Sequence, residues 1–390
     1  MRYSLHPARV TASIASCLLV LSGAASVAAA PPVDAVSADN SGSAVATAED
    51  RAASAIARSL SSPAWRTRVR KAVLTSDEVS ITSLATEAGS AARPTLLDAE
   101  RQIATAKGLG FTVGPLLHMR LGADSMRAAL AAGDTPWVAA AVNDDDTKVI
   151  SAYDTNGQIH ALDVRSVPTR PVYVVDIDGS KALAAGLDIV REVLHGRGLS
   201  SPAPTGPNSV RKLLRHQGLP SPAGAASSGY WTTRVTSVRV SDDEEPWIKG
   251  KAEIYTLVTG FGYNGKARVD AVNMPYLDKG KTTYHPNQIL INWSYYKYNQ
   301  ADVVMMEDDG NTNYRDLAKA ISAGLLGITD LGAYTSLTDA VLNAIPDNWW
   351  TDDDDFVESW YSLYKNANGS FHGARGNGWM NLQPYFVEQF

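Results

Sequence analysis

Cysteine is almost absent from the chain of 390 residues, and its scarcity excludes several kinds of site. The one cysteine, Cys17, lies inside the signal peptide described below, so we expect the mature chain to contain no thiol. Disulfide bonds, thiolate zinc centres, iron–sulfur clusters and cysteine nucleophiles are therefore excluded. Such a protein depends on its hydrophobic core, or on bound metal, for stability.

Long apolar runs are also missing. The apolar segment Ile14–Leu21 is far shorter than the roughly 20 residues of a membrane helix. It follows Arg2 and Arg9, and a series of small residues closes it at Ala29. This order is typical of a signal peptide. We therefore expect residues 1–30 to be cleaved near Ala29, and the mature protein to be soluble, secreted and without a membrane span.

Motifs for several common chemistries do not occur. The histidines are scattered, with no HExxH motif and no pair at zinc-ligand spacing. No phosphate-binding loop, dinucleotide fingerprint or G-x-S-x-G elbow is present. The formal net charge is −6 and there is no basic stripe, which argues against nucleic acid as a partner. The sequence therefore specifies no reaction and no catalytic residue.

What the chain does contain is unevenly distributed. After Ser228 there are 21 Asp+Glu and 13 Lys+Arg, a net charge of −8. Seven of the nine tryptophans and thirteen of the sixteen tyrosines also follow Ser228. We interpret this shift as two modules, residues 46–195 and 229–390. We expect a disordered leader at 31–45, and a Pro/Ser/Gly-rich linker at 196–228 between the modules.

The first module begins with helical patterns and continues with strand patterns. Helices are predicted at 46–60, 65–74 and 94–107, strands at 137–142, 148–153, 158–164 and 172–176, and a closing helix at 181–195. Turn sequences separate the first three strands, which predicts an antiparallel meander. The module is therefore expected to be α+β.

The second module is mostly strand. Strands are predicted at 230–240, 252–260, 266–272, 289–295, 301–306 and 379–390, and inserted helices at 314–326 and about 336–344. Asn313 is a candidate N-cap, with Asp316 three residues on. This spacing favours an antiparallel β-sandwich with inserted helices.

Carboxylates gather at the predicted strand ends of the second module. Antiparallel strand ends meet at the two tips of a sandwich, and Ca²⁺ takes six to eight oxygen ligands, mostly from such loops. The candidate metal ligands are Asp242, Asp243, Glu244, Glu245, Glu253, Glu307, Asp308 and Asp309. The alternative is that these acids are solvated turns and helix caps.

Aromatic residues suggest a second kind of site. Trp349, Trp350 and Trp360 are candidates for a face that stacks on sugars. The alternative is that they belong to the core, where most aromatic residues of a sandwich lie.

Several phrases of the sequence resemble a known family. They are EPWIKGKAEIY from Glu245, MPYLD from Met274, TYHPNQ from Thr283, EDDG from Glu307, and RPVYVVD from Arg170. Together they resemble a family of exported bacterial proteins that is catalogued as a domain of unknown function. The resemblance implies export and a shared two-part plan, but no activity and no catalytic residues. If both modules belong to one family, the segment 196–228 is an insertion within one unit.

The sequence thus predicts a secreted, non-catalytic binding or interaction protein with a calcium-stabilised β-sandwich. Its partner is expected to be an extracellular polysaccharide or protein. The alternative is a secreted hydrolase that acts on glycans or peptides through the clustered carboxylates.

Overall fold

The computed structural model describes residues 39–142, 147–200, 229–241, 247–249, 252–308, 310, 312–345 and 356–388, which fall in one compact unit. Helix α1 (Asp39–Ser59) begins within the segment that we predicted to be a disordered leader. Its alanine-rich register continues backwards from the predicted helix, and Val45 and Ala48 are fully buried. The expected signal peptide at 1–30 lies outside the described residues.

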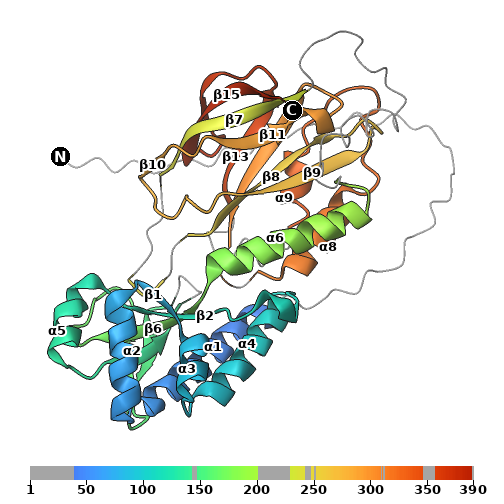
Figure 1. The fold of residues 1–390 in the computed structure, drawn as a ribbon. Coiled ribbons are helices and arrows are strands. Elements are labelled where there is room, and N and C mark those ends of the chain that lie inside the picture. Colours follow the sequence, from blue (N-terminus) through green and yellow to red (C-terminus); the bar gives the residue numbers. More distant parts are fainter. Residues whose placement is uncertain are drawn as a thin grey trace, which may run out of the picture. The chain divides into compact units, whose positions relative to one another are not determined.

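Sheet A is built from the first half of the chain (Figure 1). Its strands are β1 (Glu78–Ser80), β2 (Leu117–Leu121), β3 (Trp137–Ala140), β4 (Val149–Tyr153), β5 (Ile159–Asp163) and β6 (Val172–Ile177), in the order β1-β2-β6-β3-β4-β5. Strands β3, β4 and β5 form the predicted antiparallel meander. Strand β6 is antiparallel to β2 and parallel to β3, which the sequence analysis did not anticipate.

The two faces of sheet A are covered differently. In β6, Tyr173 and Val175 point into the main core, whereas Val172 and Val174 point into a separate cluster on the other face. The helices that precede β2 all contribute to the main core, namely α1, α2 (Pro63–Thr75), α3 (Ile81–Ala88) and α4 (Arg93–Ala106). The short helix α5 (Arg127–Ala132) follows β2. Because side chains on both faces of β6 are buried, its sequence is apolar at nearly every position.

The second half forms two antiparallel sheets, as predicted. Sheet B has the order β10-β7-β15-β14, from β7 (Gly229–Val240), β10 (Thr283–Tyr284), β14 (Gly369–His372) and β15 (Gly378–Glu388), and β11 (Gln288–Asn292) also pairs with β7. Sheet C has the order β13-β12-β8-β9, from β8 (Ile254–Phe261), β9 (Ala267–Asn273), β12 (Gln300–Glu307) and β13 (Phe356–Tyr364). The prediction missed β10, β13 and β14.

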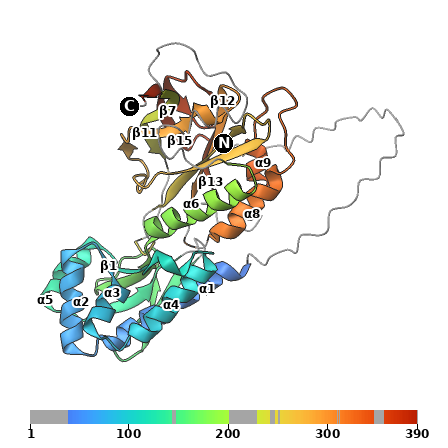
Figure 2. The ribbon, with the colours of Figure 1, turned by 45° about the vertical axis from the view of Figure 1, so that its right-hand side comes forward.

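Sheet C is the middle layer of three. Val258 and Val303 face sheet B across the sandwich core, whereas Leu257 and Val304 face the other way, into the main core. On that side lie α6 (Gly179–Gly196), α8 (Tyr314–Leu325) and α9 (Thr338–Leu342). Figure 2 shows α6 and α8 lying along each other beneath the strands. Because both faces of the sheet are covered, every residue of β8 is buried.

One continuous core joins the two halves. It includes Leu96 and Tyr173 from the first half, Val190 from α6, and Tyr255 and Leu317 from the second. Helix α6 was assigned to the first module from sequence, yet it packs on α8 and β9. The chain is thus α+β, with helices first and antiparallel sheets following, as the sequence predicted.

Candidate functional site

The pairing of β8 with β12 brings three of the predicted metal ligands to one end of sheet C. Glu307 lies opposite Ile254 in the register, and the Asp308 amide donates to the Glu253 carbonyl at 3.0 Å. Residues that are more than 50 positions apart in sequence are therefore neighbours at this strand end. The backbone pairing therefore places Glu253 beside Glu307 and Asp308, whereas the predicted meeting of the 242–245 and 307–309 acids involves residues outside the described ranges.

Asp308 is buried, and a lysine from the first half neutralises its charge. The side chains of Lys107 and Asp308 are both 0% exposed, and the Lys107 ammonium lies 3.3 Å from each Asp308 carboxylate oxygen. The same ammonium donates to the Gly310 carbonyl at 2.9 Å and lies over the Tyr314 ring. The Tyr314 hydroxyl donates to Asp308. An ammonium, held by oxygens as a metal would be, therefore occupies this point.

Asn313 completes the strand end as predicted. Its side chain accepts from the Asp316 amide at 3.2 Å and caps α8, and its amide group donates to the Ala106 carbonyl at 2.7 Å. The cap of α8 thus also contacts the end of α4. Burial and the Asp308 carboxylate together raise the pKa of Tyr314 well above its ordinary value, so its hydroxyl stays protonated and donates.

Glu253 is an acid whose ionisation is strongly perturbed. Its carboxylate packs against Gly179 at the start of α6, so closely that any side chain at position 179 would overlap it. Burial, and then the negative charges of Asp308 and Asp176, raise the pKa of Glu253 to about 9. At neutral pH this carboxyl group is therefore protonated.

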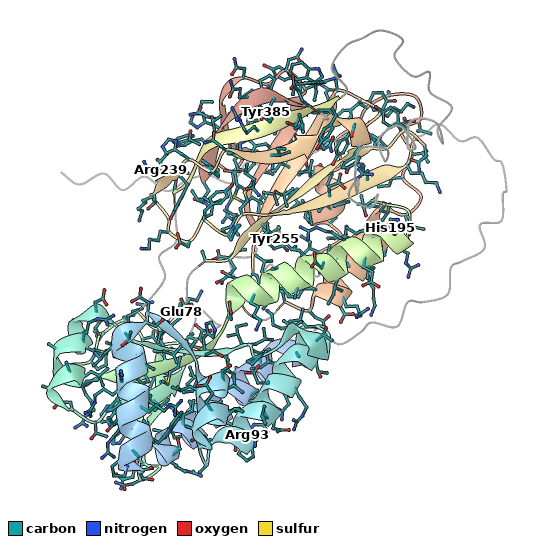
Figure 3. The ribbon with its side chains drawn as sticks, in the orientation of Figure 1. Glu78, Arg93, His195, Arg239, Tyr255 and Tyr385 are labelled. Atoms are coloured by element: carbon teal, nitrogen blue, oxygen red, sulfur yellow. The ribbon has the colours of Figure 1, made fainter. Side chains whose placement is uncertain are left out.

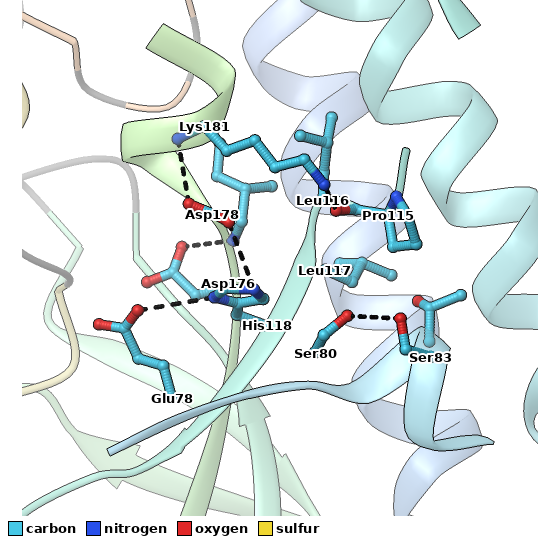
Figure 4. A network of polar contacts seen from close by, with 12 residues as sticks. Glu78, Ser80, Ser83, Pro115, Leu116, Leu117, His118, Asp176, Asp178 and Lys181 are labelled. Carbon is cyan, nitrogen blue, oxygen red and sulfur yellow. Dashed lines mark hydrogen bonds and ion pairs between the residues drawn. The ribbon is translucent and has the colours of Figure 1, made fainter. Parts of the chain in front are cut away.

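A histidine lies between two further carboxylates beside this point (Figure 4). The His118 ring places Nδ1 3.5 Å from Glu78 and Nε2 3.4 Å from Asp178. The contact with Glu78 is the largest cause that raises the pKa of His118, ahead of Asp178, and burial opposes both. Asp178 also caps α6 by accepting from the Lys181 amide at 3.0 Å. These residues lie where β1, β2 and β6 reach the start of α6.

Asp176 and Arg120 connect this histidine cluster to the second half. Burial raises the pKa of Asp176, and the nearby Arg120 guanidinium partly offsets that effect. Arg120 donates to the carbonyls of Trp247 and Ile248, at 3.2 and 2.8 Å, and to that of Lys249. Ile248 itself is fully buried in the cluster on the outer face of sheet A. The chain just before Glu253 is therefore anchored in the first half.

We call the set Glu78, Lys107, His118, Asp176, Asp178, Glu253 and Asp308 the acidic junction. Sequence reasoning found only Glu253 and Asp308 among its members. Lys107 ends a helix, where a basic residue is expected for the dipole alone, and its partner is 201 residues away. Asp176 and Asp178 had a detectable signal, because one acid lies near the end of the apolar strand β6 and the other directly follows it, just before a helix.

Two other buried acids accept hydrogen bonds from loops. Asp302 accepts from the Tyr334 and Ser336 hydroxyls and from the amides of Leu337 and Ser362, at 2.7–2.8 Å. Glu358 accepts from amides of the tight turn that joins β14 to β15. Carboxylates used in this way hold loops in place.

The remaining predicted ligands have no structural counterpart here. Asp242, Asp243, Glu244, Glu245 and Asp309 lie outside the described residues. Within the part of the chain that the structure describes, no three His, Cys, Asp or Glu side chains are arranged to hold a metal ion. A metal at the acidic junction would therefore need ligands from residues 242–245 or 309.

The predicted aromatic face is not formed by Trp360. This side chain is 3% exposed, lies in the sandwich core and donates to the Phe371 carbonyl at 3.0 Å. It therefore has no free ring face for a sugar, as the core alternative anticipated. Trp349 and Trp350 lie outside the described residues. None of the helices in the described ranges has the length and apolar character of a membrane span.

Comparison with known proteins identifies a family but no activity. The chain matches the family described as protein of unknown function, DUF3103, over residues 51–390. No curated protein matches it. The match begins within α1 and runs through both halves, including every member of the acidic junction and the segment 196–228. This protein therefore belongs to the DUF3103 family, as the resemblance in its sequence had suggested.

Proposed function

We propose that this chain is an exported, non-catalytic binding protein in which the acidic junction binds Ca²⁺ and links the two halves. The observation that carries the proposal is the gathering of the Asp176, Glu253 and Asp308 carboxylates at one place in the fold, where burial and their mutual repulsion raise the pKa of Glu253 to about 9. A divalent cation near this group would relieve the repulsion and favour the ionised form. Its target would be an extracellular protein or polysaccharide.

Two features support calcium rather than a smaller cation. Beside the point that Lys107 occupies, the acidic junction has carboxylates on separate strands and helices, which would suit the flexible coordination of Ca²⁺ better than the octahedron of Mg²⁺. The acids at 242–245 precede an anchored segment, because Arg120 fixes the carbonyls of Trp247 and Ile248. Ligands next to a fixed segment lose less conformational entropy when they bind.

The test is a calcium titration of the full chain, followed by its melting temperature. Calcium at millimolar concentration should raise the melting temperature, EDTA should reverse the rise, and magnesium should have a smaller effect. The variant Glu253→Gln should lose most of the response, whereas Glu87→Gln, at an exposed helix position, should keep it. An unchanged melting temperature at millimolar calcium would overturn the proposal.

The same observation favours one alternative, a hydrolase. A carboxyl group that stays protonated at neutral pH is suited to act as a general acid. Against this reading, Asp308 beside it is fully buried and held by Lys107 and Tyr314, so it is poorly placed to be the second catalytic carboxylate. Screening of peptide and glycan substrates separates the two, because Glu253→Gln would abolish turnover by a hydrolase while its fold is retained.

A further inference from the structure

A cavity of about 480 Å³ lies away from the acidic junction, between α6, β9 and β11. It is lined along α6 by side chains from Asp188 to His195, and His195 is labelled on that helix in Figure 3. This volume falls within the range of small-molecule sites. We propose that the cavity binds a small amphipathic amine, a molecule with an apolar body and one cationic group.

The apolar part of the cavity comes from the edge of sheet B. The register of β11 against β7 shifts between Ile289 and Ile291, and such a bulge re-aims the side chains around it. Ile289 and Leu290 both line the cavity, and Ile289 is 38% exposed. Val272 of β9 adds to this wall. These aliphatic groups would bury the body of the ligand.

The polar part is rigid. Asp270 receives two hydrogen bonds from Arg268, at 2.7 and 2.6 Å, and a third from the Tyr296 hydroxyl at 2.7 Å. A carboxylate accepts about four hydrogen bonds, so among the residues that the structure describes one acceptor position of Asp270 remains for a ligand. Arg191 is also fixed, since it donates to the Ala271 carbonyl and to Asp188. The site is therefore preorganised in the structure.

The charge of the lining favours a cation. The three carboxylates of Asp188, Glu192 and Asp270 outnumber the two guanidiniums that pair with them, because Arg191 bonds to Asp188 and Arg268 to Asp270, which leaves the charge of Glu192 in excess. The chain after Ser228 is also acidic, with a net charge of −8. An anionic ligand would meet a net negative lining, whereas an amine at the rim would face Glu192 on the exposed surface of α6.

The edge of β9 is not open to an added peptide strand. The Val269 amide donates to Leu199, the Ala271 carbonyl accepts from Arg191, and the Asn273 carbonyl accepts from Gln288. These contacts cap the outward-facing groups that strand addition would need. This leaves the cavity to a small molecule.

The proposal is tested by titration calorimetry on the full chain with phenethylamine, phenethyl alcohol and phenylacetate, which share a phenyl ring on a two-carbon unit and carry a positive, a neutral and a negative head group. Phenethylamine should bind saturably at one site, the alcohol more weakly and phenylacetate weakest. Glu192→Gln should weaken binding of the amine by about threefold and leave the affinity for the alcohol unchanged. Glu87→Gln is its matched control on another helix.

A second pair of variants tests the location. Ile289→Trp should fill the cavity and abolish binding of both the amine and the alcohol, with little change in melting temperature. Ile159→Trp, at an exposed position of β5, is the control and should bind normally. The proposal is overturned if phenethylamine does not saturate, if phenylacetate binds as tightly, or if the well-folded Ile289→Trp protein binds like the original.

Discussion

Among single side chains, the buried pair of Lys107 and Asp308 poses the sharpest energetic question. Removing two charges from water costs more free energy than their attraction alone returns, unless further hydrogen bonds complete the environment. Here the Gly310 carbonyl, the Tyr314 hydroxyl and the Tyr314 ring supply those partners. The pair is therefore tolerated in the core, but neither member is dispensable alone.

Loss of the Lys107 charge should destabilise the protein strongly. The variant Lys107→Met keeps the length of the side chain but leaves Asp308 buried without its ammonium, which should lower the free energy of unfolding by about 3–5 kcal/mol. Arg68→Met is the control, because its ion pair with Glu87 is exposed and should matter by less than about 1 kcal/mol. Urea unfolding measures both, and equal losses would contradict the buried pairing.

Glu253 should make stability depend on pH. Its pKa is raised from 4.5 to about 9, so between these values the native state binds more protons than the unfolded state. Its contribution is fully present below about pH 4.5 and is lost as pH rises through the folded pKa.

Relative to the original protein, Glu253→Gln should therefore gain stability as pH increases, by at most about 1.4 kcal/mol per pH unit. Chemical unfolding between pH 5 and 9 in the absence of calcium measures this difference. A difference that stays constant with pH would show that Glu253 ionises normally. Glu87→Gln controls for the loss of a carboxylate.

Among the helices and strands, the contact of α6 with α8 depends on one glycine. Gly186 faces the Tyr314 ring so closely that a methyl group at this position would overlap it. Tyr314, whose hydroxyl donates to Asp308, thus also sets the spacing of the two helices.

The variant Gly186→Ala should destabilise the protein by about 1–3 kcal/mol, because overpacking outweighs the gain in helix propensity of about 1 kcal/mol. Gly196→Ala, at the last residue of the same helix, meets no atom within 4 Å and should be neutral or slightly stabilising. Thermal unfolding of the two variants provides the comparison. Equal behaviour would contradict the close approach of α6 and α8.

Local patterns anticipated most of the regular elements. The strands β3 to β9 were predicted to within two residues, and the Asn313 cap was confirmed, because periodicity and capping are properties of neighbouring residues. The strand β13 was missed. Its regular strand pattern is interrupted, because Ser362 adopts a positive φ of 52° at a bulge.

Contacts between residues far apart in sequence were harder to predict. The acids at 242–245 and 307–309 were expected to meet, because strand ends of a sandwich converge, and the first of these clusters lies outside the described residues. Lys107, His118 and Arg120 were not identified, since their roles depend on how the first half packs against the second. Burial of Trp360 had likewise been left open, because aromatic residues serve cores and surfaces alike.

For the molecule as a whole, the shared core predicts that the second half does not fold alone. A fragment that begins at residue 229 lacks α6 and exposes Tyr255, Tyr314 and Leu317. It should show weak near-UV circular dichroism and no cooperative unfolding, whereas the full chain should unfold in one transition. A fragment at 229–390 with a sharp transition would show that the halves are independent.

The pairing of β7 with β15 also determines when sheet B can form during synthesis. Gly229 pairs with Glu388, so the longest ladder of sheet B joins the first and last strands of the second half. A growing polypeptide carries β7 for about 150 residues of synthesis before its partner exists. Sheet B therefore closes only after the ribosome has passed Glu388, and a chain that stops before Gly378 leaves one side of β7 unpaired, as an edge exposed to aggregation.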